Sequence, residues 1–178
     1  MRRRVSAPTT CAAAALLALG LTACGGGGYK TKTLHLNERD TNDFGFSDAP
    51  PKTKVGKQGP QSLSPGDVVS FRSVLIDASK KPVGELNAEC VMTHAGTFDT
   101  AKAQCTGTAT VPGGELVLNV GGRFGGAVTH GALVGGTGDF KGAGGTFDSV
   151  QVSNGPNKDT FNIQIPQKED ARTPPMRG

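Results

Sequence analysis

The sequence predicts an all-β fold, an eight-stranded antiparallel β-barrel. Short runs of alternating apolar and polar residues recur between residues 30 and 165, and Gly, Pro, Asn and Asp separate them. No stretch keeps a helical apolar period over three turns. Eight strands in one domain favour a closed barrel, because closure removes the unpaired edge strands.

The alternation is clearest where Leu116, Leu118 and Val120 share one strand face, and it repeats at Phe161–Ile165. Each strand is bounded by turn-forming residues. The expected strands are, in order, Lys30–Glu38, Asp67–Asp77, Val83–Thr93, Ala101–Val111, Glu115–Gly121, Ala127–Val134, Thr146–Val152 and Asp159–Ile165.

Two segments outside these strands have loop composition. Asp40–Pro65 is rich in Pro, Gly, Ser and Lys, and we expect a long mobile loop there. Residues 167–178 are polar and contain prolines, which is typical of a disordered tail. The predicted barrel domain is therefore residues 30–166.

The first residues have the pattern of an export signal. Arg2–Arg4 precede an apolar run at Ala12–Leu21, which is too short to span a bilayer core that needs about 20 apolar residues. Leu21–Cys24 then resembles the lipobox of bacterial lipoproteins. The resemblance implies removal of a signal peptide, residues 1–23, and a lipid on the Cys24 thiol. Residues 24–29 would be a glycine tether to the extracytoplasmic face of the cell membrane; a plain secreted protein with an incidental cysteine is the alternative.

Charge argues against nucleic acid as a partner. Removal of residues 1–23 leaves 155 residues and lowers the formal net charge from +4 to +1, because Arg2, Arg3 and Arg4 are lost. The basic isoelectric point therefore belongs mostly to the signal and the tail. No basic patch with interleaved aromatic residues remains.

Cys90 and Cys105 flank an expected hairpin turn at His94–Thr100. The two thiols would then lie nearly opposite each other on adjacent strands, where a disulfide is geometrically possible. Such a bridge fits an oxidising compartment. Two free buried thiols or a metal-binding pair are the alternatives. The three histidines lack metal-ligand spacing, so we predict no metal site and no cofactor.

Gly135–Gly145 is the most glycine-rich internal segment, and it does not fit a nucleotide loop. A P-loop requires Gly-Lys-Ser/Thr before a helix, but Asp139 follows Gly138 here. A dinucleotide fingerprint likewise requires a following helix. Glycines with positive φ, with Phe140 as an apolar plug, favour a corner between two strands.

This segment resembles the corner of the allene oxide cyclase and dirigent superfamily. A second match runs from Gly66-Asp67-Val68-Val69-Ser70-Phe71 to Cys90-Val91, and a weaker one covers Leu34–Asp40. Together the matches span roughly residues 33–165. The resemblance implies an eight-stranded antiparallel barrel with a central cavity, which agrees with the strand count.

The resemblance also identifies site positions in the cyclases, and few are kept here. The cyclases have an acidic residue two positions before an asparagine on the first strand; the matching residues are His35 and Asn37. Their second-strand asparagine is matched by Ser73, and a proline by Phe44. Cys90 matches a cysteine of the third strand.

The dirigent corner usually ends Ala-Arg-Gly, whereas this chain has Ala143-Gly144-Gly145. Together with the substitutions at the strand positions, the missing arginine removes most of the family's polar cluster. The sequence therefore does not support cyclisation of a fatty-acid epoxide.

Two pairs of residues remain candidates for a site. His35 and Asn37 share one strand face, and an inward His35 would be an acid or base near the barrel mouth. The alternative is a polar pair that satisfies its neighbours. Arg72 and Ser73 alternate, so one of them faces inward; an inward Arg72 would bind a carboxylate or phenolate ligand.

Three functions stay open. The first is a membrane-tethered barrel that binds a small apolar or amphipathic molecule without covalent chemistry. The second is an isomerase- or cyclase-like enzyme, or a dirigent-like guide of a ring closure, that acts chiefly by shape. The third is a cell-envelope interaction module with a barrel filled by side chains, which would assemble with itself or with another protein.

Overall fold

The computed structural model describes residues 28–50, 52, 55–56, 59–60, 62–153 and 155–167. The predicted signal peptide, the lipidation site Cys24 and the tail from residue 168 lie outside the described residues.

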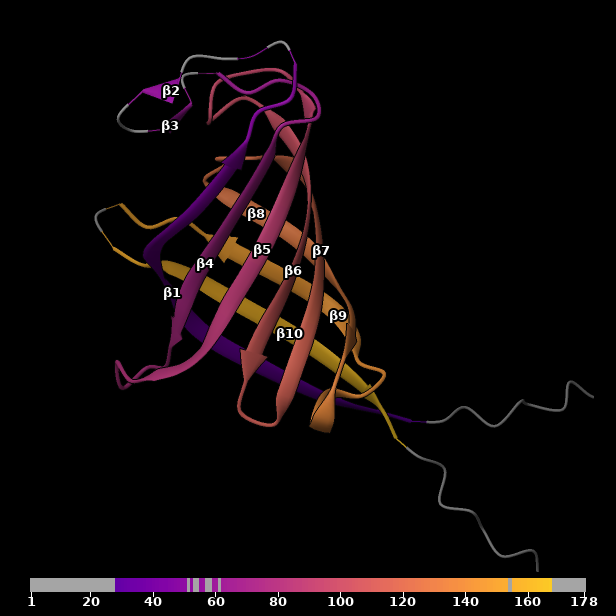
Figure 1. Ribbon diagram of the computed structural model, residues 1–178. Coiled ribbons are helices and arrows are strands. Elements are labelled where there is room, and N and C mark those ends of the chain that lie inside the picture. Colours follow the sequence, from indigo (N-terminus) through magenta and orange to yellow (C-terminus); the bar gives the residue numbers. More distant parts are fainter. Residues whose placement is uncertain are drawn as a thin grey trace, which may run out of the picture.

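Eight antiparallel strands close into a barrel in the order β1-β10-β9-β8-β7-β6-β5-β4 (Figure 1). This confirms the predicted fold class. The barrel strands are β1 Tyr29–Ser47, β4 Val68–Ile76, β5 Pro82–His94, β6 Lys102–Val111, β7 Gly114–Arg123, β8 Val128–Gly136, β9 Gly144–Val150 and β10 Asn157–Pro166. The two-residue strands β2 (Val55–Gly56) and β3 (Gly59–Pro60) pair with each other outside the barrel.

β1 is longer than the alternation predicted, and the expectation of a loop from Asp40 is wrong as far as Ser47. Its first half pairs with β10, from Tyr29 opposite Pro166 to Glu38 opposite Asn157. Its second half pairs with β4 as far as Ser47, across a β-bulge between Asp40 and Asp43. The barrel is therefore closed by the pairing of the first strand with the last, β10, and the pairing of residues 43–47 with β4 outweighs their loop-like composition.

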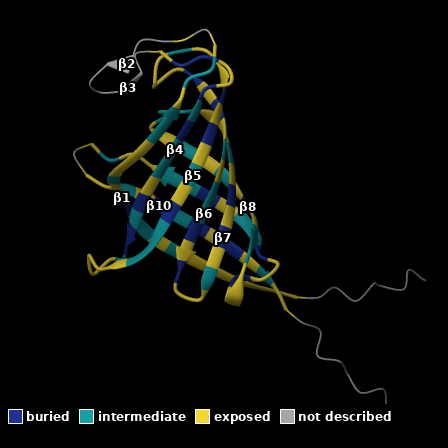
Figure 2. Ribbon diagram, viewed as in Figure 1, coloured by how far each residue is buried: buried dark blue, intermediate teal, exposed yellow. Residues whose placement is uncertain are grey.

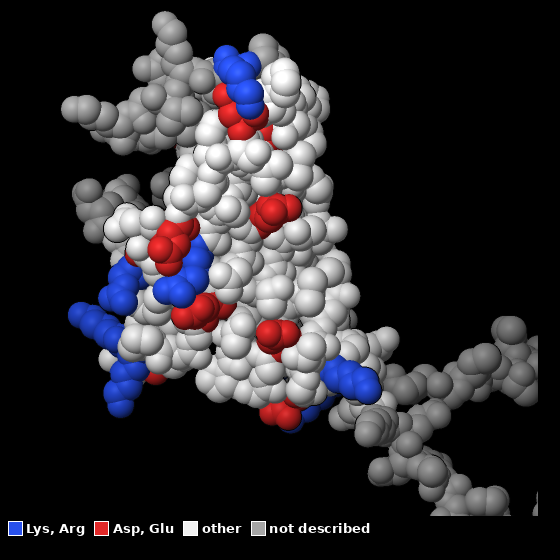
Figure 3. Space-filling model, in the orientation of Figure 1, with Lys and Arg blue, Asp and Glu red and all other residues white. Residues whose placement is uncertain are grey.

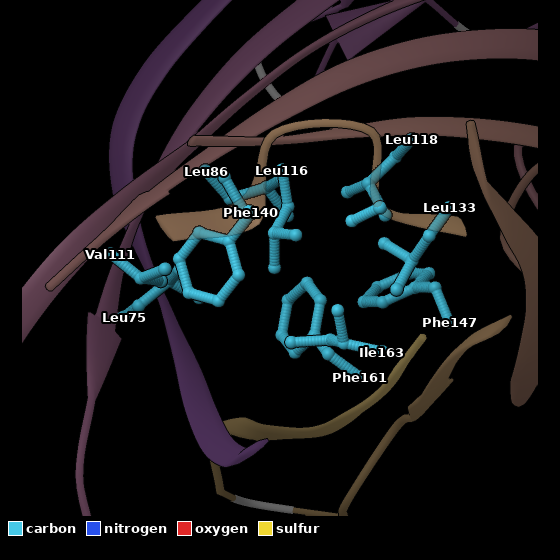
Figure 4. Packing of buried hydrophobic residues seen from close by; sticks show 12 residues of the cluster. Leu75, Leu86, Val111, Leu116, Leu118, Leu133, Phe140, Phe147, Phe161 and Ile163 are labelled. Atoms are coloured by element: carbon cyan, nitrogen blue, oxygen red, sulfur yellow. The ribbon is translucent and has the colours of Figure 1, made fainter. Parts of the chain in front are cut away.

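Residues along each barrel strand alternate between the buried interior and the solvent-exposed outside (Figure 2). At one end of the barrel the inward side chains form a dense apolar cluster (Figure 4). Phe147 and Phe161 pack there with ring centroids 5.0 Å apart. Phe140 is fully buried in the same cluster, and the Lys32 ammonium lies 5.0 Å from the centre of its ring. This end of the barrel is therefore filled by side chains.

The glycine-rich segment forms the predicted corner between β8 and β9, with Phe140 as its plug. A single 3-10 turn, η1 (Gly138–Phe140), follows β8, and the Asp139 backbone N–H donates to the Gly113 carbonyl at 2.8 Å. Gly138 has a φ of 57°, and a Cβ atom there would collide with the Gly113 carbonyl oxygen. The corner is thus built against the β6–β7 turn, and only glycine fits at residue 138.

A second apolar cluster lies towards the other end and contains the predicted disulfide. Cys90 and Cys105 are directly opposite each other on β5 and β6 and form that bond. Cys90 is buried with Met92 and Val69, and Leu63 packs on this group from the loop before β4. Leu63 is held there by paired backbone hydrogen bonds with Gly96, of 2.8 and 3.0 Å. The two clusters leave the middle of the barrel between them.

The two ends of the described chain lie side by side. Tyr29 pairs with Pro166, and the Gln167 backbone N–H donates to the Gly28 carbonyl at 2.8 Å. Both ends leave the barrel on the side of the β8–β9 corner, away from the β5–β6 turn (Figure 1).

The corner can be tested by an alanine pair. We expect Gly138→Ala to lower the free energy of unfolding by at least roughly 1–2 kcal/mol, because a left-handed residue gains a Cβ that also meets backbone. In Gly135→Ala the new methyl has open space, so a change within about 0.5 kcal/mol is expected. Equal stabilities of the two variants in urea unfolding would contradict this account of the corner.

Candidate functional site

The barrel interior contains a cavity of about 410 Å³. It lies between the two apolar clusters, and it opens near the β5–β6, β7–β8 and β9–β10 connections. Its volume is within the range of small-molecule sites. Its inner apolar wall is formed by Leu86, Ala88, Leu118, Val120 and Phe147.

A β-bulge lies in the cavity wall beside the opening. Thr41 and Asn42 are the extra residues between Asp40 and Asp43 of β1, and Asn42 has a left-handed φ of 64°. The Thr41 hydroxyl donates to the Arg72 carbonyl at 2.6 Å and so fastens the bulge to β4. Such bulges re-aim side chains and occur often next to functional sites.

Glu38 faces the cavity from the point where β1 leaves β10 and joins β4. It is 8 % exposed, and the Asn157 amide donates to its Oε2 at 3.4 Å. Burial raises the pKa of this carboxyl, the Ser73 and Asn157 hydrogen bonds lower it, and the charge of Asp40 raises it. Ser73 also donates to Asp40 Oδ1 at 3.5 Å.

Asp159 lies beneath Glu38 on the inner face of β10. It is 1 % exposed, and neither of its carboxylate oxygens has a hydrogen-bond partner among the described residues. Burial, followed by the charge of Glu38, raises the pKa of Asp159 to about 7. The hydroxyl of Ser149, directly opposite on β9, lowers this pKa to a smaller extent, although its geometry falls short of a hydrogen bond.

Sequence reasoning missed this carboxylate pair because the two residues are far apart along the chain. A signal was nevertheless present in the alternation. Asp159 is two residues before Phe161, and Glu38 is two residues after Leu36. Each acid therefore continues the apolar face of its strand, a position that predicts an inward and buried carboxyl.

His35 and Asn37 do share a strand face, and that face is the outer one. His35 is exposed, and its Nδ1 lies 3.2 Å from the Thr160 hydroxyl on the outside of β10. Neither residue lines the cavity. Inner and outer faces alternate residue by residue, so Leu36 and Glu38 take the inner positions at this level.

Ser73 is the inward member of the second candidate pair, and it is fully buried. Arg72 lies on the outer face of β4, at the rim of the cavity, and its side chain is 43 % exposed. Its guanidinium lies 3.1 Å from Asp43 and 3.7 Å from Glu85. Oppositely charged side chains gather on this face over β1 and β4 (Figure 3).

Other features of the described residues do not form a competing site. A hollow of about 680 Å³ over the outer face of β4–β7 is wide open to solvent. Within the described ranges no three His, Cys, Asp or Glu side chains are grouped to bind a metal ion. His130 pairs with Asp148 at 2.6 Å on the outer surface of β8 and β9. No described helix has the length and apolar character that crossing a membrane requires.

Comparison with known proteins identifies the fold. Neither a family model nor a curated protein sequence matches this chain. A solved structure of a pyocyanin demethylase matches with a TM-score of 0.61 and 20 % identity over 74 % of this chain and 99 % of that protein.

Two further solved structures are similar. A pterocarpan synthase dirigent protein has a TM-score of 0.53 and 21 % identity, over 77 % of this chain and 84 % of its own. A Diels-Alderase from Streptomyces koyangensis has a TM-score of 0.54 and 12 % identity, over 81 % and 72 %. The chain therefore has the barrel fold of the allene oxide cyclase and dirigent-like proteins.

Proposed function

We propose that this chain is an extracytoplasmic, membrane-anchored barrel that binds a small apolar or amphipathic molecule in its interior. The cavity of about 410 Å³ carries this proposal. Eight-stranded barrels are wide enough for one small ligand when side chains leave the centre open. The apolar wall opposite Glu38 would bind the apolar part of such a molecule, and the rim would bind a polar group.

The cavity argues against the interaction module. That function expects a barrel filled by side chains, whereas here the filling is confined to the two clusters at either end. The cavity is open to solvent, so its apolar wall is hydrated in the absence of a ligand. A ligand that occupies it removes this apolar surface from water, which favours a binding role.

The location rests on two features. The Leu21–Cys24 motif resembles a lipobox, and the Cys90–Cys105 disulfide fits an oxidising compartment. A lipid on Cys24 would leave only a short glycine-rich stretch before β1 begins at Tyr29. The barrel would thus be held close to the membrane surface.

A second candidate is an acid–base catalyst or a guide of a cyclisation, and Asp159 is the observation that favours it. A carboxyl with a pKa of about 7 is matched to proton transfer near neutral pH. Solved structures with this fold include a demethylase and Diels-Alderases. To separate the two candidates, the mass and retention time of the bound molecule are measured before and after its incubation with the protein. A conversion that the Asp159→Asn variant no longer performs supports catalysis, and an unchanged molecule supports binding alone.

Filling the cavity tests the binding role. Ala88 lines the cavity on β5, whereas Ala132 is exposed on the outside of β8. We expect protein purified from its own cell to carry a small molecule in native mass spectrometry. Ala88→Trp should lose it, and Ala132→Trp should retain it. Retention of the molecule by a folded Ala88→Trp variant would exclude the cavity as its site.

Removing the buried acid tests the electrostatics. The pKa of Asp159 rises from 3.8 in the unfolded chain to about 7, so folding is penalised increasingly from pH 4 to pH 7. Asp159→Asn should therefore stabilise the protein at pH 8 by up to roughly 4 kcal/mol and change it little at pH 4. Urea unfolding at both pH values measures this. A variant that is destabilised at pH 8 would show that Asp159 is a satisfied carboxylate.

Cys24→Ser tests the anchor. The variant should no longer take up radiolabelled fatty acid, and it should move from the membrane fraction to the soluble fraction. Cys11→Ser, within the same predicted signal peptide, is the matched control and should remain labelled. Continued labelling of Cys24→Ser would contradict the lipoprotein assignment.

A further inference from the structure

The inner acids of this barrel have no cationic partner among the described residues. Among the described residues, Arg72 forms ion pairs with Asp43 and Glu85, and His130 contacts Asp148. None of them involves Glu38, Asp40 or Asp159. Glu38 and Asp40 therefore line the cavity, and Asp159 is buried next to Glu38 behind the lining, without a compensating charge from the described residues.

Such an arrangement is costly, and Asp159 shows it most directly. Both of its oxygens are buried and unpartnered, on an inward-facing position that it shares with Phe161. A buried carboxyl normally has hydrogen bonds or a counter-charge. Exceptions call for an explanation, and a functional role of the carboxyl is one.

The groups that face the pair do not supply a charge. From β4 only the Ser73 hydroxyl is directed at them, and from β9 the Ser149 hydroxyl lies opposite Asp159. Asn157, on β10 itself, contributes a neutral amide. On the outer surface, Lys158 alternates with Asp159 and points away from it.

Charged groups at the rim do not reach the pair either. Arg72 is engaged by Asp43 and Glu85. Arg123 is exposed at the end of β7, on the far side of the cavity opening. The side of the cavity formed by Glu38 and Asp40 is therefore negative, and the apolar wall of Leu118, Val120 and Phe147 is neutral.

We propose that the occupant of this cavity is a protonated amine on a flat apolar body, with its ammonium group against Glu38, which lines the cavity in front of the buried Asp159. This inference rests on the proposed binding function and names its ligand class. The N–H groups of the ammonium would donate to the Glu38 carboxylate, and its positive charge would offset the charge of the neighbouring Asp159. The apolar body contacts Leu118, Val120 and Phe147. The same negative charge would weaken the binding of fatty acids and other carboxylates.

Three probes of equal size test the inference. Naphthalen-2-ylmethanamine is a cation between about pH 6 and pH 8, naphthalen-2-ylmethanol is neutral, and 2-naphthoate is an anion. Because the protein has no Trp and one Tyr, naphthalene fluorescence can be read directly during titration. At pH 8 we expect the amine to bind at least about tenfold more tightly than the alcohol, and the naphthoate most weakly.

The preference for the amine over the alcohol should increase with pH. Asp159 is largely protonated at pH 6 and largely ionised at pH 8, so amine affinity should rise across this interval. Each unit by which the bound cation lowers the pKa of Asp159 makes that rise up to about tenfold larger. The alcohol should show no rise.

Matched variants assign the effect to the pair. Asp159→Asn and Glu38→Gln should each reduce the preference for the amine over the alcohol, and the double variant should abolish it. Asp148→Asn removes a carboxylate from the outer surface and should leave the preference unchanged. Native mass spectrometry confirms that each variant is folded and binds one probe.

The outcomes distinguish this inference from the binding function. Tight binding of the alcohol with no preference for the amine would overturn the inference and keep the cavity as a binding site. Failure of all three probes to bind wild-type protein, together with no co-purified molecule, would overturn both. A preference for the amine that persists in the double variant would place the cation elsewhere.

Discussion

β1 is the strand on which the rest of the structure depends. The sheet becomes a closed barrel only because its first and last strands pair, and β1 makes this contact with β10 before it pairs with β4. The change of partner occurs at Asn37 and Glu38, which pair with both neighbours. The bulge at Thr41–Asn42 allows the strand to bend shortly after this change of partner. Glu38 therefore lies at the point of β1 where the barrel closes.

The fold could be predicted because it depends on local patterns. Alternation marks strands, glycines with positive φ mark the β8–β9 corner, and the positions of Cys90 and Cys105 predict their pairing. The second half of β1 could not be read in this way, since its pairing with β4 is a long-range contact. Residues 40–47 have a polar, glycine-containing composition that local reasoning assigns to a loop.

The site was harder to predict than the fold for a similar reason. Resemblance to a family directs attention to His35, but a shift of one residue along a strand exchanges inside and outside. The structure puts Glu38 and Asp159 on the inside, and they meet only when the first and last strands pair. Their chemistry comes from burial and mutual repulsion, which depend on the closed barrel. In the sequence alone, such a buried acidic pair is indicated only by a carboxylate residue on the apolar face of a strand.

The paired chain ends have a consequence for how a lipid-anchored form would stand. Gly28 and Gln167 leave at the end that Phe140 seals, and the mouth is at the other end. Five peptide steps between Cys24 and Tyr29 reach at most roughly 18 Å. The barrel end that Phe140 fills would then face the membrane, and the cavity opening would face the aqueous space. A ligand would then enter the cavity from the aqueous phase and not directly from the lipid bilayer. This route suits a molecule that is dissolved outside the cell membrane.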